Sequence, residues 1–381
     1  MELVISKKNL LRGLTRTTAV ADRKSTMPIL SNVLVQTSDT ASLRFAGTDL
    51  YLGVLATVPC EVKRGGAVAV SARMLHDIAK NLPEGDVTFT VGPNHGAEIR
   101  AGKVRYRIPG MPGDDFPPLP ALPSGTELAQ LDVDMLTDLI GKTAFSMSTD
   151  DTRPHLSGAL FEGEGKTVRM VTTDGHRLSK AEHRTREGAP MVRFAMLVPQ
   201  KGVGELRRML DEVRSEAKGN KDEGPPQIGV AVHGGSAFFV HGALMLSVKL
   251  AEEQFPPYAK VIPQNQDKRV VIARTSLVEA LRRMSLVASD KSGGVRFQLS
   301  AGSLRIVSEN PDLGEGSEEL DVDYAGSPLT IGFNAKYLQD ALNALSDDQV
   351  ALELAGELDP GVLRPASDPN AFVGVIMPMR I

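Results

Sequence analysis

The sequence predicts an α+β protein built from three copies of one unit, each with two helices packed on antiparallel sheets. Residues 6–34 align with residues 132–160 at a constant offset of 126, so that Leu10 falls on Leu136. A third copy places Leu277 at the same position. Self-similarity at a period of roughly 127 residues indicates one architecture that is repeated, because each copy has the size of a domain.

The repeat sets the expected domains at 1–127, 128–264 and 265–381. Proline clusters lie near the C-terminal ends of the first two copies, in residues 116–120 and 255–258. Proline continues neither a helix nor a central strand, so we expect extended linkers there.

Each copy is predicted to contain two helices among short strands. The first helix covers residues 7–19, 133–145 and 275–287, and the second covers residues 72–82, 200–213 and 335–345. Short apolar or alternating runs predict strands between the helices, at residues 33–35, 68–70, 168–171 and 304–307. Residues 214–226 are polar and contain Gly and Pro, which predicts a mobile surface loop.

Apolar residues recur at equivalent helix positions in all three copies. The second helices carry Leu75/Val203/Leu338, Ile78/Leu206/Ala341 and Leu82/Leu210/Leu345, and the first helices carry Leu10/Leu136/Leu277 and Leu14/Ile140/Leu281. The spacing i, i+3, i+7 of the second helix predicts one buried stripe per helix.

Basic residues also recur at one position of each helix, on the side away from the apolar stripe. These residues are Arg16, Lys142 and Arg283 in the first helices, and Arg73, Lys201 and Lys336 in the second helices. Exposed helix positions often carry Lys or Arg, which is one interpretation of the pattern. The other is a set of equivalent cations that face one polyanion and contact phosphates without reading bases.

Composition limits the classes of function. The net charge is −4, and the three copies carry 15, 17 and 11 basic against 12, 18 and 17 acidic side chains. An ordinary DNA-binding domain is strongly basic, so any contact with nucleic acid must depend on where the cations lie. Cys60 is the only cysteine, which fits a reducing cytoplasm. No apolar run predicts a membrane span, the N-terminal residues have no secretory pattern, and no cluster of residues indicates a metal or cofactor site.

The segment 172–178, TTDGHRL, allows two interpretations. Asp174 and His176 have the chemistry of an acid–base pair, which would suit an enzyme. The corresponding segment of the first copy, Thr48–Tyr51, has no histidine, and the chain has no nucleophile motif, phosphate loop or dinucleotide fingerprint. The alternative is a turn in which Asp174 accepts hydrogen bonds from backbone amides and Gly175 adopts an unusual φ.

The C-terminal residues 375–381, VIMPMRI, are apolar. They suit a terminal strand or an adaptable hydrophobic surface, because Met side chains can repack around different partners.

Taken together, these segments resemble the β sliding clamps of bacterial DNA polymerase III over the whole chain. The resemblance rests on residues 27–32 (MPILSN), 47–49 (GTD), 173–178 (TDGHRL), 331–334 (IGFN) and 377–380 (MPMR). It implies a bacterial, cytoplasmic and nucleoid-associated protein without catalytic residues, cofactor or membrane contact. Two subunits would form a head-to-tail ring around duplex DNA, slide without sequence specificity and make the polymerase processive.

The resemblance also implies three sets of site residues. Matching positions place Lys24, Arg73, Arg153 and Lys201 near DNA, and the repeated basic column together with the neighbouring Arg23 adds Arg16, Arg23, Lys142, Arg283 and Lys336. The partner-peptide pocket would comprise Leu156, Thr173, Gly175, His176, Arg177, Leu178, Pro256, Val261, Asn334, Tyr337, Val375, Ile376, Met377, Pro378, Met379 and Arg380. At the subunit contact, Tyr106 and Ile108 would meet Leu286 and Val287 of the other chain.

The pocket would take peptides of the form Gln-Leu-x-Leu-Phe from the polymerase III α subunit, the clamp loader, and other polymerases and repair proteins. Apolar anchors would fill it. The sequence departs from the family pattern in several places. Acidic Asp150 and Asp151 precede Arg153, and Ala259 and Lys260 replace a more basic pair at the pocket rim. Ser292 replaces a bulky residue, residues 214–226 are longer than the usual loop, and the last residue is Ile381 where Leu is usual.

Overall fold

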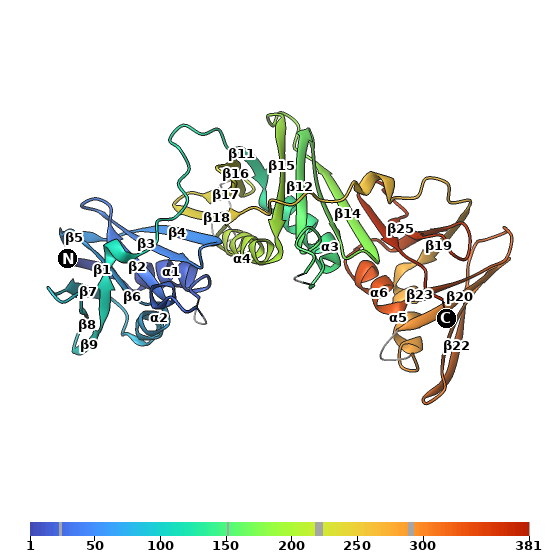
Figure 1. Ribbon diagram of the computed structural model, residues 1–381, viewed down its shortest axis with the longest axis horizontal. Helices are drawn as coiled ribbons and strands as arrows, with labels where there is room; N and C mark the ends of the chain where they lie inside the picture. Colours follow the sequence, from blue (N-terminus) through green and yellow to red (C-terminus); the bar gives the residue numbers. More distant parts are fainter. Residues whose placement is uncertain (23–24, 151, 218–223, 289–292, 381) are drawn as a thin grey trace. The chain divides into compact units, whose positions relative to one another are not determined.

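The computed structural model describes residues 1–22, 25–150, 152–217, 224–288 and 293–380 (Figure 1). The described residues form six α-helices and 26 strands, and the three repeats share one order of elements, to which the first repeat adds the strands β5 and β10. The first repeat contains β1 (Glu2–Ser6), α1 (Lys7–Thr18), β2 (Asn32–Thr37), β3 (Ser42–Thr48), β4 (Leu52–Pro59), β5 (Glu61–Arg64), β6 (Ala67–Ser71), α2 (Ala72–Asn81), β7 (Asp86–Val91), β8 (Ala97–Ala101), β9 (Val104–Ile108) and β10 (Gly110–Pro112).

The second repeat contains β11 (Ala129–Asp132), α3 (Val133–Thr143), the 3₁₀ turn η3 (Ala144–Ser146), β12 (Gly158–Gly165), β13 (Thr167–Thr173), β14 (Arg177–Arg184), β15 (Val192–Pro199), α4 (Gln200–Ala217), β16 (Gln227–His233), β17 (Ser236–His241), β18 (Leu244–Lys249) and η4 (Tyr258–Lys260). The third repeat contains β19 (Lys268–Ala273), α5 (Arg274–Met284), β20 (Gly294–Ser300), β21 (Ser303–Asn310), β22 (Gly314–Asp321), β23 (Leu329–Asn334), α6 (Ala335–Asn343), β24 (Gln349–Leu354), β25 (Gly361–Pro365) and β26 (Phe372–Ile376).

All six predicted helices are present, and their apolar stripes are buried. Each of the fifteen stripe residues is at most 6% exposed. Side chains cap the first amides of some helices: Ser6 accepts from Asn9 N at 3.2 Å at the start of α1, and Asn334 accepts from Lys336 N at 2.9 Å at the start of α6. The α+β class with antiparallel sheets is therefore confirmed.

One prediction about an element is wrong. Residues 214–217 were expected in a loop, but α4 continues through Ala217. Val213 is 1% exposed and extends the buried stripe beyond Leu210, so the helix still has an apolar face to pack at that point. Residues 218–223 lie outside the described part of the chain.

Sheets continue from one repeat into the next. The nine-stranded sheet has the order β10-β6-β2-β3-β4-β18-β17-β16-β11, and the eight-stranded sheet has the order β15-β12-β13-β14-β26-β25-β24-β19. In the first sheet, β4 pairs with β18, from Ala56 opposite Leu244 to Leu52 opposite Val248. In the second, β14 pairs with β26, from Arg177 opposite Ile376 to Ala181 opposite Phe372. The fourth strand of one repeat therefore pairs with the last strand of the following repeat.

Two smaller sheets have edge strands with different charge. One has the order β5-β1-β7-β8-β9 and the other β22-β21-β20-β23. β9 carries Arg105 and Arg107, whereas β22 carries Glu315, Glu318 and Glu319 and alternates between exposed and half-buried positions. The acidic run around Glu315–Glu319 is thus an exposed strand edge.

The repeats do not coincide with the compact units of the structure. One unit comprises Met1–Val133 with Gly204–Leu250, and the other comprises Asp134–Val203 with Ala251–Ile381. The larger core cluster of the first unit surrounds α1 and α2 and includes Leu10, Leu14 and Leu75. A cluster of the second unit includes Leu178, Val362 and Val375. No helix in the described residues is long and apolar enough to cross a membrane.

Candidate functional site

The segment between β13 and β14 is a tight turn. Asp174 Oδ1 accepts hydrogen bonds from the amides of His176 and Arg177 at 2.9 and 3.0 Å, and Gly175 has φ +90°. Thr173 Oγ1 donates to the carbonyl of Arg177 at 2.7 Å and accepts from the amide of Gly175 at 3.1 Å. This is the predicted turn, in which a short polar side chain replaces the backbone partners of a strand end.

The first repeat contains the same turn. Asp49 Oδ1 accepts from the amides of Tyr51 and Leu52 at 2.9 and 2.6 Å, and Thr48 Oγ1 donates to the carbonyl of Leu52 at 2.6 Å. Leu50 has φ +77° at the position of Gly175. The structural role of the segment is therefore repeated at Thr48–Tyr51 of the first repeat, a segment that has no histidine.

The carboxylate of Asp174 is engaged within its own turn. Its second oxygen, Oδ2, accepts from Arg177 Nε at 3.0 Å. These bonds run to the backbone and to Arg177 rather than to the exposed imidazole of His176, so the geometry favours the turn over an acid–base pair. Among the described residues, no group of three or more His, Cys, Asp or Glu is placed to hold a metal ion.

The C-terminal segment of the third repeat lies against this turn of the second. The amide of Met377 donates to the carbonyl of His176 at 2.9 Å, and the amide of Met379 donates to the carbonyl of Gly332 at 2.8 Å. Gly332 lies in β23, two residues before Asn334, which is the N-cap residue of α6. Residues from both repeats, far apart in the chain, therefore meet in one compact unit.

The predicted pocket residues divide into a buried group and an accessible group. Leu156, Leu178, Val375 and Ile376 are buried, each at most 6% exposed. The accessible apolar and polar groups are Val261, Met377, His176, Pro256, Tyr337, Pro378 and Met379, with Val261 45% and Met377 40% exposed. Gly175 and Arg380 are exposed as well, and Thr173 is 9% exposed.

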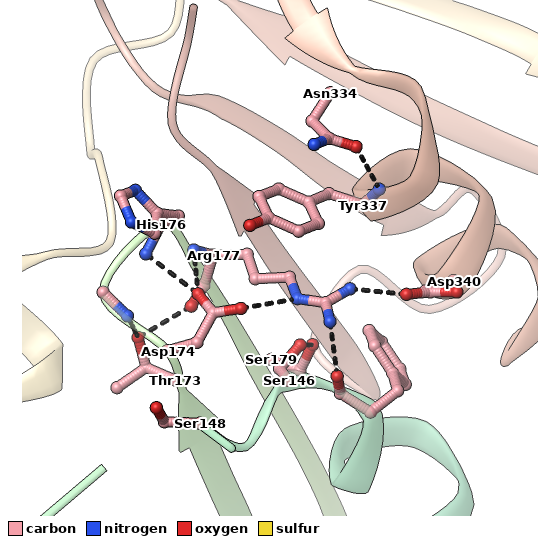
Figure 2. A network of polar contacts seen from close by, with 12 residues as sticks. Ser146, Ser148, Thr173, Asp174, His176, Arg177, Ser179, Asn334, Tyr337 and Asp340 are labelled. Atoms are coloured by element: carbon pink, nitrogen blue, oxygen red, sulfur yellow. Dashed lines mark hydrogen bonds and ion pairs between the residues drawn. The ribbon is translucent and has the colours of Figure 1, made fainter. Parts of the chain in front are cut away.

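Arg177 lies at the centre of a polar network (Figure 2). Its Nη1 donates to Asp340 Oδ2 on α6 at 2.7 Å, and its Nη2 donates to the carbonyl of Phe145 in η3 at 2.6 Å. The guanidinium carbon lies 4.4 Å from the ring centroid of Tyr337. Burial, followed by the negative charge of Asp174, raises the pKa of the Tyr337 hydroxyl.

Three aromatic and aliphatic residues hold the segment that contains Pro256 and Val261. Phe255, Tyr258 and Ile262 pack on the cluster that includes Leu178 and Val375. Tyr258 also donates to Glu162 at 2.8 Å, and burial together with this carboxylate raises the pKa of its hydroxyl. The sequence prediction missed these anchors, as it missed Asp340. The proline cluster at 256–257 was the available signal for an extended segment beside them.

The repeated basic column is exposed at four of its six positions. The exposed residues are Arg73, Lys201, Arg283 and Lys336. The side chain of Arg73 is 70% exposed and that of Lys336 is 73% exposed. Arg283 is paired with Glu318 at 2.6 Å, which raises the pKa of Arg283 and lowers that of Glu318. Arg23 and Lys24 lie outside the described residues.

The prediction that the other two positions, Arg16 and Lys142, are exposed is wrong. Arg16 is 4% exposed, because Nε contacts Glu212 at 2.5 Å and Nη2 contacts Glu216 at 3.1 Å. Lys142 is 13% exposed and pairs with Asp138 at 2.7 Å. Burial opposes ionisation of Asp138, but hydrogen bonds from His183 and Lys142 outweigh it and lower the pKa of the carboxyl.

Arg153 is directed toward the turn by its acidic neighbour. Its Nε donates to Asp150 at 2.9 Å and its Nη1 to the carbonyl of Asp174 at 3.1 Å. The proposed cation is thus partly neutralised, as the position of Asp150 in the sequence suggested. Of the predicted subunit-contact residues, Leu286 and Tyr106 are 77% and 39% exposed, whereas Ile108 is 8% exposed and Val287 is half-buried.

Comparison with known proteins agrees with this arrangement. Family models of the DNA polymerase III beta subunit match residues 1–120 with the N-terminal domain, 130–220 with the central domain and 259–380 with the C-terminal domain. The chain is 35% identical to the beta sliding clamp of Pseudomonas putida over 385 residues and 34% identical to that of Escherichia coli K12, with full coverage of every chain.

Solved structures are equally similar. A crystal structure of the DNA polymerase III subunit beta from Pseudomonas aeruginosa has a TM-score of 0.91 and 33% identity, with full coverage of both chains. A structure of the sliding clamp of the same organism bound to griselimycin has a TM-score of 0.89 and 33% identity, again over both full chains. The three repeats, their shared sheets and these matches together establish that the chain belongs to the DNA polymerase III beta subunits, the β sliding clamps.

Proposed function

We propose that this β sliding clamp, a processivity factor of DNA polymerase III, closes head to tail into a dimeric ring around duplex DNA and tethers its partners through the pocket between the second and third repeats. The observation that carries the proposal is the meeting of the 173–178 turn with the C-terminal segment, where Met377 N donates to His176 O at 2.9 Å. Three clamp domains with boundaries near 127/128 and 264/265 would supply one half of the ring.

The order of strands supports the ring. Within the chain, β4 of the first repeat pairs with β18 of the second, and β14 of the second pairs with β26 of the third. The strand of the third repeat that corresponds to β4 and β14 is β22, and the strand of the first repeat that corresponds to β18 and β26 is β9. Both are edge strands. Because an edge strand is a template for a further strand, β22 of one subunit and β9 of the next would repeat the same junction between copies.

Charge and apolar surface favour this contact. The arginines of β9 complement the acidic residues of β22, and complementary charge steers association and sets register. We place Tyr106 and Ile108 against Leu286 and Val287 of the partner subunit. Leu286→Asp should convert a dimer into a monomer in sedimentation velocity, whereas Leu358→Asp, at a residue that is 59% exposed elsewhere, should leave the dimer intact. A dimeric Leu286→Asp variant would refute the placement.

We propose that the residues facing DNA are Arg73, Arg153, Lys201, Arg283 and Lys336. Arg23 and Lys24 are candidates from the sequence alone. Arg16 and Lys142 are the least accessible members of the predicted set. Phosphate contacts by separate cations position a protein without reading bases. Topological retention together with weak, salt-sensitive contacts suits sliding.

The pocket would bind short peptides of the form Gln-Leu-x-Leu-Phe. Its exposed Val261 and Met377 can cover apolar side chains, and methionines adapt to different partners. Candidate partners are the polymerase III α subunit, the clamp loader, and other polymerases and repair proteins. The structure of a relative bound to griselimycin is consistent with a ligand site on this fold. His176 acts as a wall or hydrogen-bonding residue, the protein has no turnover, and its place is the bacterial cytoplasm at the nucleoid.

Peptide binding tests the proposal directly. A fluorescein-labelled Gln-Leu-Ala-Leu-Phe peptide is titrated with the full chain and with a variant that lacks residues 377–381, and polarisation is recorded. We expect saturable binding that the truncation abolishes while circular dichroism stays native. Met377→Ser should weaken binding, and Met191→Ser, at a methionine that is 80% exposed outside the pocket, should not. A folded wild-type protein that does not bind the peptide would refute the pocket.

A further inference from the structure

The side chain of Arg177 is buried, although the residue belongs to the proposed pocket. It is 10% exposed, and each of its three guanidinium nitrogens already donates a hydrogen bond within the protein. The rings of Tyr337 and Phe145 lie at 4.4 and 5.4 Å from its guanidinium carbon (Figure 2). A peptide in the pocket would therefore find this side chain already engaged.

The partners of Arg177 come from both repeats that contribute to the proposed pocket. Asp174 belongs to the turn of the second repeat, the Phe145 carbonyl to η3, and Asp340 to α6 of the third repeat. The backbone of Arg177 pairs with Ile376 in β26. One guanidinium thus holds both sides of the pocket together, and a rigid fork with several donors suits this role better than a lysine would.

Asp340 provides the link to the third repeat. Its Oδ2 accepts from Arg177 at 2.7 Å and its Oδ1 accepts from Lys336 at 3.2 Å. It lies three residues after Tyr337 on α6, so both side chains are on the face of the helix that contacts Arg177. No direct contact with a peptide is needed for Asp340 to affect the pocket, because it sets where α6 and Tyr337 lie.

From this geometry we propose that Arg177 and Asp340 are positioning residues, and that the affinity of the pocket depends on their ion pair although neither side chain contacts the peptide. The inference rests on the proposed peptide-binding function and adds Asp340 to the residues that determine it. Groups held in place beforehand lower the cost of ordering a site when a ligand binds.

A double-mutant cycle on peptide affinity tests the inference. The probe is fluorescein-labelled Gln-Leu-Ala-Leu-Phe, and the variants are Asp340→Asn, Arg177→Lys and both together, each as the full chain. We expect each substitution to weaken binding by about tenfold and the double variant to be no weaker than either, because residues of one network are strongly coupled. Asp340→Glu keeps the charge and should recover part of the affinity.

The control removes a similar ion pair that does not involve Arg177 or any proposed pocket residue. Glu353 is 21% exposed and holds Arg364 Nε at 3.1 Å, in the same compact unit as Asp340, which is 22% exposed. Glu353→Gln should leave the peptide affinity unchanged. Melting temperatures of all variants are measured without peptide, so that a loss of affinity is compared among folded proteins. If Asp340→Asn does not fold, the test is the peptide affinity of Arg177→Lys compared with the affinities of the wild type and of Glu353→Gln.

The outcomes are distinct. A folded Asp340→Asn or Arg177→Lys variant with wild-type affinity would overturn the inference, as would strictly additive losses in the cycle or an equal loss in Glu353→Gln. Each of these leaves the proposed function intact, because the wild-type protein still binds. Failure of the wild-type protein to bind the peptide would instead refute the pocket itself.

Discussion

The substitution Arg16→Met distinguishes between two roles for Arg16, a structural ion pair and a contact with DNA phosphate. Arg16 is 4% exposed and contacts Glu212 at 2.5 Å and Glu216 at 3.1 Å, which places it in a tie between α1 and α4. The backbone carbonyl of Arg16 also accepts from Arg208 at 2.9 Å, and this bond survives the substitution. The change therefore removes one buried cation and leaves the helix contact otherwise in place.

The magnitude follows from the exposure of the two carboxylates. A buried hydrogen bond to a charged group contributes about 1.5–3 kcal/mol, whereas an exposed ion pair contributes about 0.2–1 kcal/mol. Glu212 and Glu216 are 25% and 38% exposed, so both regain water when Arg16 is lost. We expect a destabilisation of about 2 kcal/mol in total, or a fall of about 4–8 °C in the melting of a unit of this size.

Arg12 is a matched control on the same helix. It pairs with the same Glu216 at 2.9 Å but is 43% exposed, so Arg12→Met should cost less than about 1 kcal/mol. Unfolding is followed by circular dichroism in urea and by calorimetry.

The second assay compares the salt dependence of binding to duplex DNA between about 50 and 200 mM salt. The quantity compared is the slope of the logarithm of DNA affinity against the logarithm of salt concentration. If Arg16 has a structural role, Arg16→Met leaves this slope unchanged, whereas the loss of a phosphate contact would reduce its magnitude by about 0.9. An Arg16→Met variant with wild-type stability and a smaller slope would refute the structural assignment.

Three further predictions concern the turn, an acidic residue beside a strand edge, and an exposed cation. Gly175→Ala places a side chain at φ +90° and should cost about 1–2 kcal/mol in calorimetry and weaken peptide binding; an unchanged melting temperature would contradict this. The pKa of Glu98 is lowered to about 2, chiefly by hydrogen bonds from Arg105 and then Arg107, so its contribution to stability is complete above about pH 4.5 and lost as the pH falls toward 2. The difference in melting temperature between wild type and Glu98→Gln should therefore shrink between about pH 6 and pH 2.5, and a constant difference would exclude this role. Arg73→Gln should lower the salt slope of DNA binding by about 0.9 without a change in melting temperature, and an unchanged slope would remove Arg73 from the DNA-facing set.

Local features were predictable from the sequence because they depend on neighbours along the chain. The buried stripes follow from helical spacing, and the 173–177 turn follows from an Asp-Gly pair between strands. The burial of Arg16 could not be predicted in this way, because its partners Glu212 and Glu216 come from another repeat. A helical wheel shows which side of a helix faces its own core, but it does not show a second helix that covers the opposite side.

The site was predictable to the same extent. Similarity to a family supplied the residues of the proposed pocket, whereas Asp340 carries no local signal that distinguishes it from any other acid on an exposed helix face. Its role depends on the distance between α6 and Arg177, which is a property of the folded chain. The continuation of α4 through Ala217 was missed for a different reason, since polar composition outweighed the buried Val213 in the loop prediction.

The shared sheets also have a consequence for how the chain is made on the ribosome. Ser247 of β18, which donates to Gly53 of β4, lies 194 positions further along the sequence. At a synthesis rate of about 5–20 residues per second, β18 is made roughly 10–40 s after β4, and during that time β4 is paired with β3 on one side only. The nascent first repeat is therefore an expected client of chaperones that shield open strands, and a slowed ribosome between residues 60 and 244 should increase aggregation of the newborn protein.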